Sequence, residues 1–150
     1  MWQSAEVTNE YSRLSPAEQV TLLNLWGIFR SPLMMGGYLP ENDSLTLALL
    51  TNKNLIELNQ NGTGNRVTYT DENIAAWTAA SGDGKTTWLA LFNLADKKQT
   101  MGVNLKAEGL KERTSYRAHD IWTKKQIILA GGKETTLEAH ESVLYKIFHD

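Results

Sequence analysis

The spacing of apolar residues changes once along this chain, and that change limits the folds open to it. Up to residue 61 apolar side chains recur every three to four positions, which is the period of a helix. A turn-forming run, NGTGN at residues 61–65, follows. Beyond it apolar and polar residues alternate, which is the period of a strand. The sequence therefore predicts a helical segment over 1–64 and an antiparallel β domain over 65–150.

The first predicted helix begins at Ser15. The Ser15 hydroxyl can cap the helix, Pro16 suits the first helical position, and Glu18 can complete a capping box. Its apolar residues cover more than half of the circumference; they are Val20, Leu22, Leu23, Leu25, Trp26, Ile28 and Phe29. A helix of this kind is buried more deeply than an ordinary surface helix. We therefore expect other elements to cover it on both sides.

A short apolar run and a second helix follow. Residues 31–36, SPLMMG, predict a very short buried strand that leads into a Gly-rich loop. Residues 42–44, NDS, offer an N-cap for a second helix over 43–59, interrupted near Thr51 and Asn52. A helix–strand–helix unit thus precedes a region that otherwise has only strand character.

Eight short strands are predicted after residue 65, spaced about ten residues apart. They are RVTYT, IAAWTAA, TTWLALFNL, QTMGVNLK, TSYRAHDIW, KQIILA, ETTLEA and SVLYKIF. Asp83-Gly84 is the clearest hairpin signal between them, and we expect neighbouring strands to pair as in a meander. The predicted fold class is mainly β: an antiparallel β-sandwich of about eight strands, preceded by helices.

Charge and composition exclude several kinds of partner. The net charge is -2, and no element gathers Lys and Arg into a basic stripe, so no nucleic-acid partner is predicted. No apolar run approaches about 18 residues, so no membrane partner is predicted, and the N-terminus lacks the regions of a signal peptide. The chain has no cysteine, which excludes disulfides and thiolate zinc sites.

No catalytic, substrate-binding or metal-binding residue is assigned from these patterns, and no cofactor is predicted. His119, His140 and His149 do not fall at metal-ligand spacing, although Glu138, His140 and Glu141 could in principle meet. The carboxylates lie in turns and on polar strand faces rather than at the ends of apolar strands. A self-contained hydrolase is hard to build from such residues.

The tryptophans of the strand region allow two interpretations. Trp77 and Trp88 flank the Asp-Gly hairpin almost symmetrically, which favours a cross-strand pair in the core. Together with Trp122 and Tyr116 they could instead form a platform on which a sugar stacks.

The order of motifs resembles the C-terminal part of the α-galactosidase (melibiase-type) family of glycoside hydrolases. The motifs are LSPAEQVTLLNLWGIFRSPLMMGG, LTLALLTNKNLIELNQ, LALFNL and HDIW, and the resemblance extends over residues 14–148. In that family a (β/α)8 barrel is followed by an antiparallel sandwich. The resemblance implies that residues 15–30 form the seventh barrel helix, 31–36 the eighth strand and 43–59 the eighth helix.

The resemblance also implies which parts of the active site this chain lacks. Family members hydrolyse terminal α-galactosides with retention, using two aspartates about 5 Å apart, and both would lie N-terminal to Met1. A complete barrel needs about 250 residues. Where many relatives carry an acidic residue and an arginine after the eighth strand, this chain has Gly37-Tyr38-Leu39-Pro40, which leaves the substrate open. We therefore expect no autonomous catalysis.

The expected partners follow from the same resemblance. The exposed barrel elements would bind either the missing N-terminal barrel portion or a second copy of the chain, and a homodimer is favoured. The alternative function is a carbohydrate-binding or protein-contact sandwich module. A periplasmic or extracellular location is favoured for the full-length family member, while the location of this chain stays open.

Overall fold

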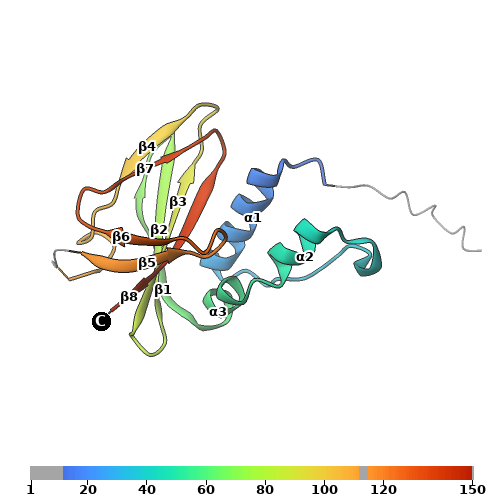
Figure 1. The fold of residues 1–150 in the computed structure, drawn as a ribbon, viewed down its shortest axis with the longest axis horizontal. Helices are drawn as coiled ribbons and strands as arrows, with labels where there is room; N and C mark the ends of the chain where they lie inside the picture. The colour runs from blue at the N-terminus through green and yellow to red at the C-terminus, as the bar shows by residue number, and fades with distance from the viewer. Residues whose placement is uncertain (1–11, 112–114, 150) are drawn as a thin grey trace, which may run out of the picture.

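The computed structural model describes residues 12–111 and 115–149, which form eight strands and a helical segment (Figure 1). The helical elements are α1 (Pro16–Phe29), the 3-10 turn η1 (Leu39–Glu41), α2 (Ser44–Leu50) and α3 (Lys53–Asn61). The strands are β1 (Gly62–Thr70), β2 (Ile74–Ser81), β3 (Thr86–Asn93), β4 (Gln99–Gly102), β5 (Tyr116–Asp120), β6 (Gln126–Leu129), β7 (Glu134–Leu137) and β8 (Ser142–Phe148). The predicted class, a mainly antiparallel β fold with helices in front, is confirmed.

The strands form a six-stranded sheet in the order β1-β2-β3-β8-β5-β6 and a separate pair, β4-β7. Every pairing is antiparallel. The meander prediction is confirmed for β1-β2-β3 and for β5-β6. It is wrong for β4, β7 and β8, because β8 lies between β3 and β5, and β4 pairs with β7. All eight residues of β3 are buried, so β3 needs a partner on each side, and the mostly buried β8 supplies the second one.

Two apolar cores lie on the two faces of the large sheet. Along β3, Leu89 and Leu91 point into the first core, which the β4-β7 pair and residues 103–110 close. The alternate residues Trp88, Ala90 and Phe92 point into the second core, which α1 and α3 close. The period of two along a strand assigns one residue set to each core. The helices are therefore packed on the sandwich through a shared core.

The predicted turn at residues 61–65 is instead the start of β1. The strand begins at Gly62, directly after α3, and its pairing with β2 shifts register between Thr63 and Arg66. Gly64 has φ +61, a conformation that glycine adopts without strain. The turn-forming residues thus make an irregularity within a strand. The predicted domain boundary between residues 64 and 65 stays a prediction.

Helix α1 begins as predicted, with the capping box between Ser15 and Glu18. Its burial differs from the prediction: Leu23 and Ile28 are buried, but Trp26 is 36% and Phe29 46% exposed. Within the described residues, the sheet and α3 cover only one side of the helix. The predicted interruption of the second helix is confirmed, since α2 ends at Leu50 and α3 begins at Lys53.

Residues 31–36 do not form the predicted buried strand. They form neither helix nor strand between α1 and η1, the Met34 N–H donates to the Pro32 carbonyl at 3.1 Å, and Met34 is 81% exposed. A strand requires a neighbour to pair with its backbone, and no strand of the described chain pairs with this run. None of the described helices is long and apolar enough to span a membrane.

Candidate functional site: an apolar face on the helical segment

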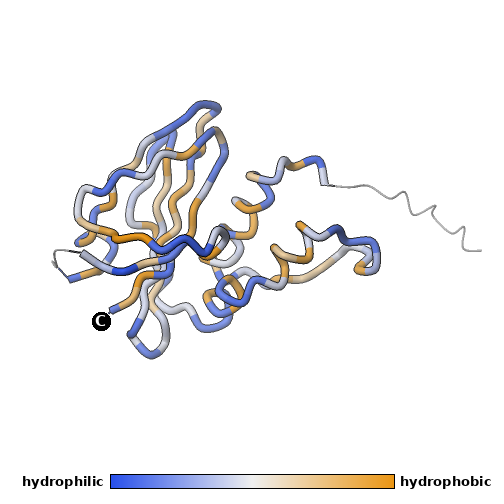
Figure 2. The backbone as a smooth tube through the Cα atoms, in the orientation of Figure 1, coloured by the Kyte–Doolittle hydropathy of each residue, from blue (hydrophilic) through white to orange (hydrophobic). Residues whose placement is uncertain are grey.

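The most unusual surface of the molecule is a set of exposed apolar side chains on the helical segment, which we call the helical apolar face. Its members are Trp26, Phe29, Met34, Met35, Tyr38, Leu39, Leu45 and Leu47, each between 36% and 81% exposed. In Figure 2 the helices α1 and α2, which contain many apolar positions, lie beside the sheet rather than within it. Exposed large apolar side chains are ordinary when they are scattered, but so many in one short segment indicate a contact surface.

A buried polar network fixes α1 on the sandwich and so orients the face. The Asn24 side chain is fully buried; its Nδ2 donates to Ser142 Oγ at 2.9 Å and its Oδ1 accepts from Trp122 Nε1 at 2.8 Å. The Thr21 hydroxyl can donate to either of two acceptors: its Oγ1 lies 2.9 Å from Ser142 Oγ and 2.8 Å from the His140 carbonyl oxygen. Because each polar group of Asn24 has a partner, its burial specifies one position of the helix.

The C-terminal end of α1 is tied to α3. Arg30, in the left-handed conformation with φ 56, donates from Nε to the Asn59 carbonyl and from Nη2 to the Gln60 carbonyl, each at 3.2 Å. Asn59 Nδ2 donates back to the Ser31 carbonyl at 2.8 Å. Gly27 allows the two helices to approach closely, since a Cβ there would lie 2.5 Å from Leu55 Cδ1. Trp26 and Phe29 are thus held outward on a fixed helix.

The rest of the face lies on a segment that projects from the body of the protein. Residues 31–43 run outward beyond α1 and return through η1 to α2 (Figure 1). The chain returns to the body of the protein after this segment. Leu49 of α2 is buried in the second core, and Asn52 Nδ2 donates to the Ile121 carbonyl at 3.0 Å. Met34, Tyr38 and Leu39 lie between α1 and these contacts and are 60 to 81% exposed.

Trp77 and Trp88 lie on one face of the sheet and on neighbouring strands, as predicted for a cross-strand pair. Trp77 pairs with Ala90 and Trp88 with Ala79, so the two rings are diagonal neighbours. Trp88 is 1% exposed, and Lys146 Nζ lies 4.8 Å from its ring centroid. Trp77 is partly buried against the same core, and Phe29 meets it edge-on at a centroid distance of 4.2 Å. The core interpretation is confirmed for Trp88.

Glu138, His140 and Glu141, for which no metal site was predicted, make separate surface contacts. His140 Nε2 pairs with Asp96 Oδ1 at 2.8 Å, and Glu138 pairs with Lys98 at 2.7 Å. Glu141 accepts a hydrogen bond from the Glu138 backbone N–H. Among residues 12–111 and 115–149, no three potential ligands lie close enough together to hold a metal ion.

His119 lies on β5 opposite Lys146 of β8. Burial lowers the pKa of His119, and the positive charge of Lys146 lowers it further. Lys146 itself forms an ion pair with Glu57 of α3 at 2.6 Å. The Lys146–Glu57 ion pair therefore connects α3 to the sheet, and we assign no catalytic role to it.

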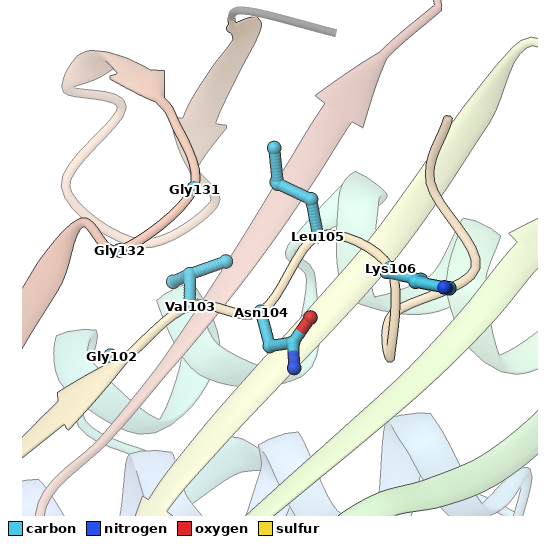
Figure 3. A pocket seen from close by; sticks show the side chains of 7 residues that line it. All are labelled: Gly102, Val103, Asn104, Leu105, Lys106, Gly131 and Gly132. Carbon is cyan, nitrogen blue, oxygen red and sulfur yellow. The ribbon is translucent and has the colours of Figure 1, made fainter. Parts of the chain in front are cut away.

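A shallow pocket of about 510 Å³ lies at the end of β4. It is lined by residues 102–106 and by Gly131 and Gly132, as Figure 3 shows. The lining has one cation, Lys106, one amide, Asn104, and no carboxylate or aromatic ring. Such a lining offers neither a general acid nor a stacking surface for a sugar. The helical apolar face is therefore the stronger candidate.

A two-layer antiparallel sandwich carries helices with an exposed apolar side, so the fold is a β-sandwich domain with a helical segment packed on it. The family model described as the alpha galactosidase C-terminal beta sandwich domain matches residues 71–147, and the chain belongs to this family. The predicted resemblance to the C-terminal part of an α-galactosidase is confirmed.

Curated relatives and solved structures agree with this membership. The α-galactosidase of Coffea arabica is 28% identical over 139 residues, which is 88% of this chain and 35% of the relative. The GH27 β-L-arabinopyranosidase of Geobacillus stearothermophilus has 35% identity and a TM-score of 0.87, over 97% of this chain and 33% of that chain. α-Galactosidase I of Mortierella vinacea, at 18% identity and TM-score 0.82, shares the fold over 95% of this chain and 37% of its own.

The chain spans about a quarter to a third of the length of the curated relatives that it matches. The matched part includes the helical segment as well as the sandwich, since between 81 and 94% of this chain is covered. The helices that bear the apolar face therefore belong to the shared architecture.

Proposed function

We propose that this chain is the C-terminal structural portion of an α-galactosidase-like glycoside hydrolase, and that the helical apolar face binds the N-terminal barrel portion. The observation that carries the proposal is the face itself: Trp26, Phe29 and Met34 are presented to solvent by a segment whose other side is firmly packed. Burying apolar surface is the main source of free energy in protein association. A barrel wall would supply the missing cover.

The run at residues 31–36 supports the same partner. No strand of the described chain pairs with it. The Ser31 carbonyl and the Met34 N–H have partners within the chain, Asn59 and the Pro32 carbonyl, so a flanking strand would pair with the remaining backbone groups. A parallel barrel would flank this run with one strand on each side. The run and the helical apolar face would then be completed by one and the same partner.

The substrate class proposed for the whole protein is a terminal α-galactoside. Retaining hydrolysis needs two carboxyl groups about 5 Å apart, and we expect both to come from the barrel portion rather than from this chain. The relatives are named as an α-galactosidase and a β-L-arabinopyranosidase, and these two sugars differ only by the hydroxymethyl group of galactose. The run Gly37-Tyr38-Leu39-Pro40 would lie near the sugar, where it could affect that choice.

A chimera tests the proposal. This chain replaces the matched third of the Geobacillus β-L-arabinopyranosidase, and hydrolysis of nitrophenyl α-galactoside and nitrophenyl β-L-arabinopyranoside is measured. We expect the chimera to hydrolyse at least one substrate, and the chain alone to release no nitrophenol between about pH 4 and 8. Turnover by the chain alone that one carboxylate substitution abolishes would overturn the structural role.

Two matched variants test whether the activity of the chimera depends on the helical apolar face. Leu47→Asp places a charge on the helical apolar face, whereas Ile128→Asp places one on β6 at a residue that is similarly exposed, 47% against 55%. We expect Leu47→Asp to abolish the chimera's activity and Ile128→Asp to preserve it. Equal loss in both variants would contradict the assignment of the contact to this face.

The same face also supports a second candidate partner, another copy of the chain. A symmetric dimer would cover Trp26 and Phe29 and could pair residues 31–36 with their own copy. Light scattering at low micromolar concentration distinguishes a dimer from a monomer.

The carbohydrate-binding module is less well supported, because Trp88 is buried and Trp77 partly buried. We also propose that the chain has a bacterial origin.

A further inference from the structure

Glu108 is a buried carboxyl group in the segment that closes the first core. Its side chain is 5% exposed, and Oε2 has no hydrogen-bond partner in the described residues. No ion pair joins it to a cation within 12–111 and 115–149. An ionised carboxylate without a paired cation is costly to bury, so such a group is stabilised as the neutral acid.

The backbone around Glu108 is fastened to strands β1 and β2. Its N–H donates to the Asn104 carbonyl at 3.1 Å. Its carbonyl lies 3.3 Å from Thr78 Oγ1, whose proton also reaches the Trp88 carbonyl at 3.0 Å. Arg66 Nη2 donates to the Ala107 carbonyl at 3.5 Å. Gly109, with φ +74, lets Arg66 pass closely, because a Cβ there would lie 3.0 Å from Nη2. These contacts place the backbone that carries Glu108 against β1 and β2.

The surroundings of the carboxyl group favour its neutral form. Glu108 Oε2 is buried without a hydrogen-bond partner among the described residues. The neighbouring Thr68 Oγ1 donates its proton to the Ala76 carbonyl at 3.2 Å. An ionised Glu108 can only accept hydrogen bonds, so it would be buried without a donor for Oε2, and the neutral acid is the form that fits the closed segment.

We propose that Glu108 is a pH-sensitive clasp, which holds residues 103–111 on β1 and β2 while its carboxyl is protonated and loosens them when it ionises. Residues 103–110 supply Val103, Leu105 and Leu110 to the first core, so loosening them uncovers that core.

The charged group facing the carboxyl is Arg66 of β1, and the contacts from β1 and β2, Thr68 and Thr78, are uncharged. Burial raises the pKa of Glu108 above its ordinary value of 4.5, against smaller opposing effects of the Thr68 hydrogen bond and the Arg66 charge. Because the raised pKa belongs to the closed state, closure is favoured most strongly below pH 4.5. That advantage is lost as pH rises through the raised pKa.

Hydrogen exchange of the full chain tests the clasp. Protection of peptides covering residues 103–111 is measured between about pH 5 and 8 and corrected for the intrinsic exchange rate. We expect protection to fall with pH by up to about tenfold per unit until the raised pKa is passed. In Glu108→Gln the side chain is neutral at every pH, so protection should stay at the low-pH level. Glu134→Gln, an exposed change on the neighbouring β7, should behave as the unchanged protein does.

Two results would overturn the proposal: a pH slope that persists in Glu108→Gln, or no slope in the unchanged protein. If Glu108→Gln does not fold, carbon NMR of the unchanged protein decides instead. A Glu108 carboxyl that titrates at or below its ordinary value of 4.5 contradicts the clasp, and one that titrates above that value supports it.

Discussion

Replacing Asn24 by alanine tests whether the helices and the sandwich unfold as one unit. The change removes both hydrogen bonds of a fully buried side chain, to Ser142 Oγ and from Trp122 Nε1. Ser142 keeps its bond with Thr21, whereas the indole N–H of Trp122 loses the partner that Asn24 provided. The damage therefore falls on the contact between α1 and the sheet.

The expected loss follows from these contacts. Leaving a buried donor unsatisfied costs about 1–3 kcal/mol, and a further loss comes from the space that the amide filled. Alanine regains about 0.6 kcal/mol through its better helix propensity. The net expectation is a decrease of about 2–3 kcal/mol in the free energy of unfolding.

Urea denaturation followed by far-UV circular dichroism and by tryptophan fluorescence measures the loss. We expect both signals of Asn24→Ala to shift together, by about 1 M in midpoint. Gln60→Ala, at an exposed position of α3, should change stability by less than about 0.5 kcal/mol. A loss below about 1 kcal/mol, or a helical signal that melts while the sheet stays intact, would refute the shared-core account.

Three further substitutions have defined outcomes in the same assay. Trp88→Ala should cost about 3–5 kcal/mol, since the ring is 1% exposed; a loss below about 1 kcal/mol would contradict its place in the core. Gly27→Ala should destabilise by about 1 kcal/mol net, because overpacking against the buried Leu55 exceeds the gain in helix propensity; a more stable variant would show that Leu55 moves aside. Ser15→Ala should cost about 1 kcal/mol by removing the capping box with Glu18; no loss would mean that the helix frays there.

The pH dependence of the capping box also has a definite sign. The pKa of Glu18 is lowered, chiefly by the hydrogen bond from the Ser15 backbone and then by the Ser15 side chain. Its contribution is therefore present above the ordinary pKa of 4.5 and is lost as pH falls through the lowered value.

Local sequence signals predicted the elements well. Ser15, Pro16 and Glu18 marked the start of α1, and the interruption near Asn52 marked the break between α2 and α3. Such signals depend on contacts within a few residues, such as the bonds from the Asn54 and Leu55 N–H groups to Asn52 Oδ1. Alternation of apolar residues likewise identified the strands, because the two faces of a sheet meet different surroundings.

Long-range pairing could not be read from the same signals. The insertion of β8 between β3 and β5 joins residues far apart in sequence, and the apolar character of β8 is compatible with several neighbours. The Asn24–Trp122 hydrogen bond connects residues 98 positions apart and has no local signature. Glu108 was one of many scattered carboxylates until the fold placed it against Thr68 and Arg66.

The buried strand predicted at residues 31–36 is absent because a strand needs a neighbouring strand to pair with. LMM has the composition of a buried strand, but burial and pairing depend on what lies beside it. That the apolar pattern marks a contact with a partner stays a prediction, while the described chain contains no strand that pairs with it. The same reasoning explains why Trp26 and Phe29 have a core-like pattern but are exposed.

Hydroxyl-radical footprinting tests the central claim, that the helical apolar face binds a barrel portion. Oxidation of Trp26, Phe29 and Met34 is compared between this chain alone and the chimera with the Geobacillus barrel, with the exposed Tyr69 of β1 as the internal control. We predict strong oxidation of the three residues in the chain alone, marked protection in the chimera, and no change at Tyr69. Equal oxidation of Trp26, Phe29 and Met34 in both proteins would contradict the claim.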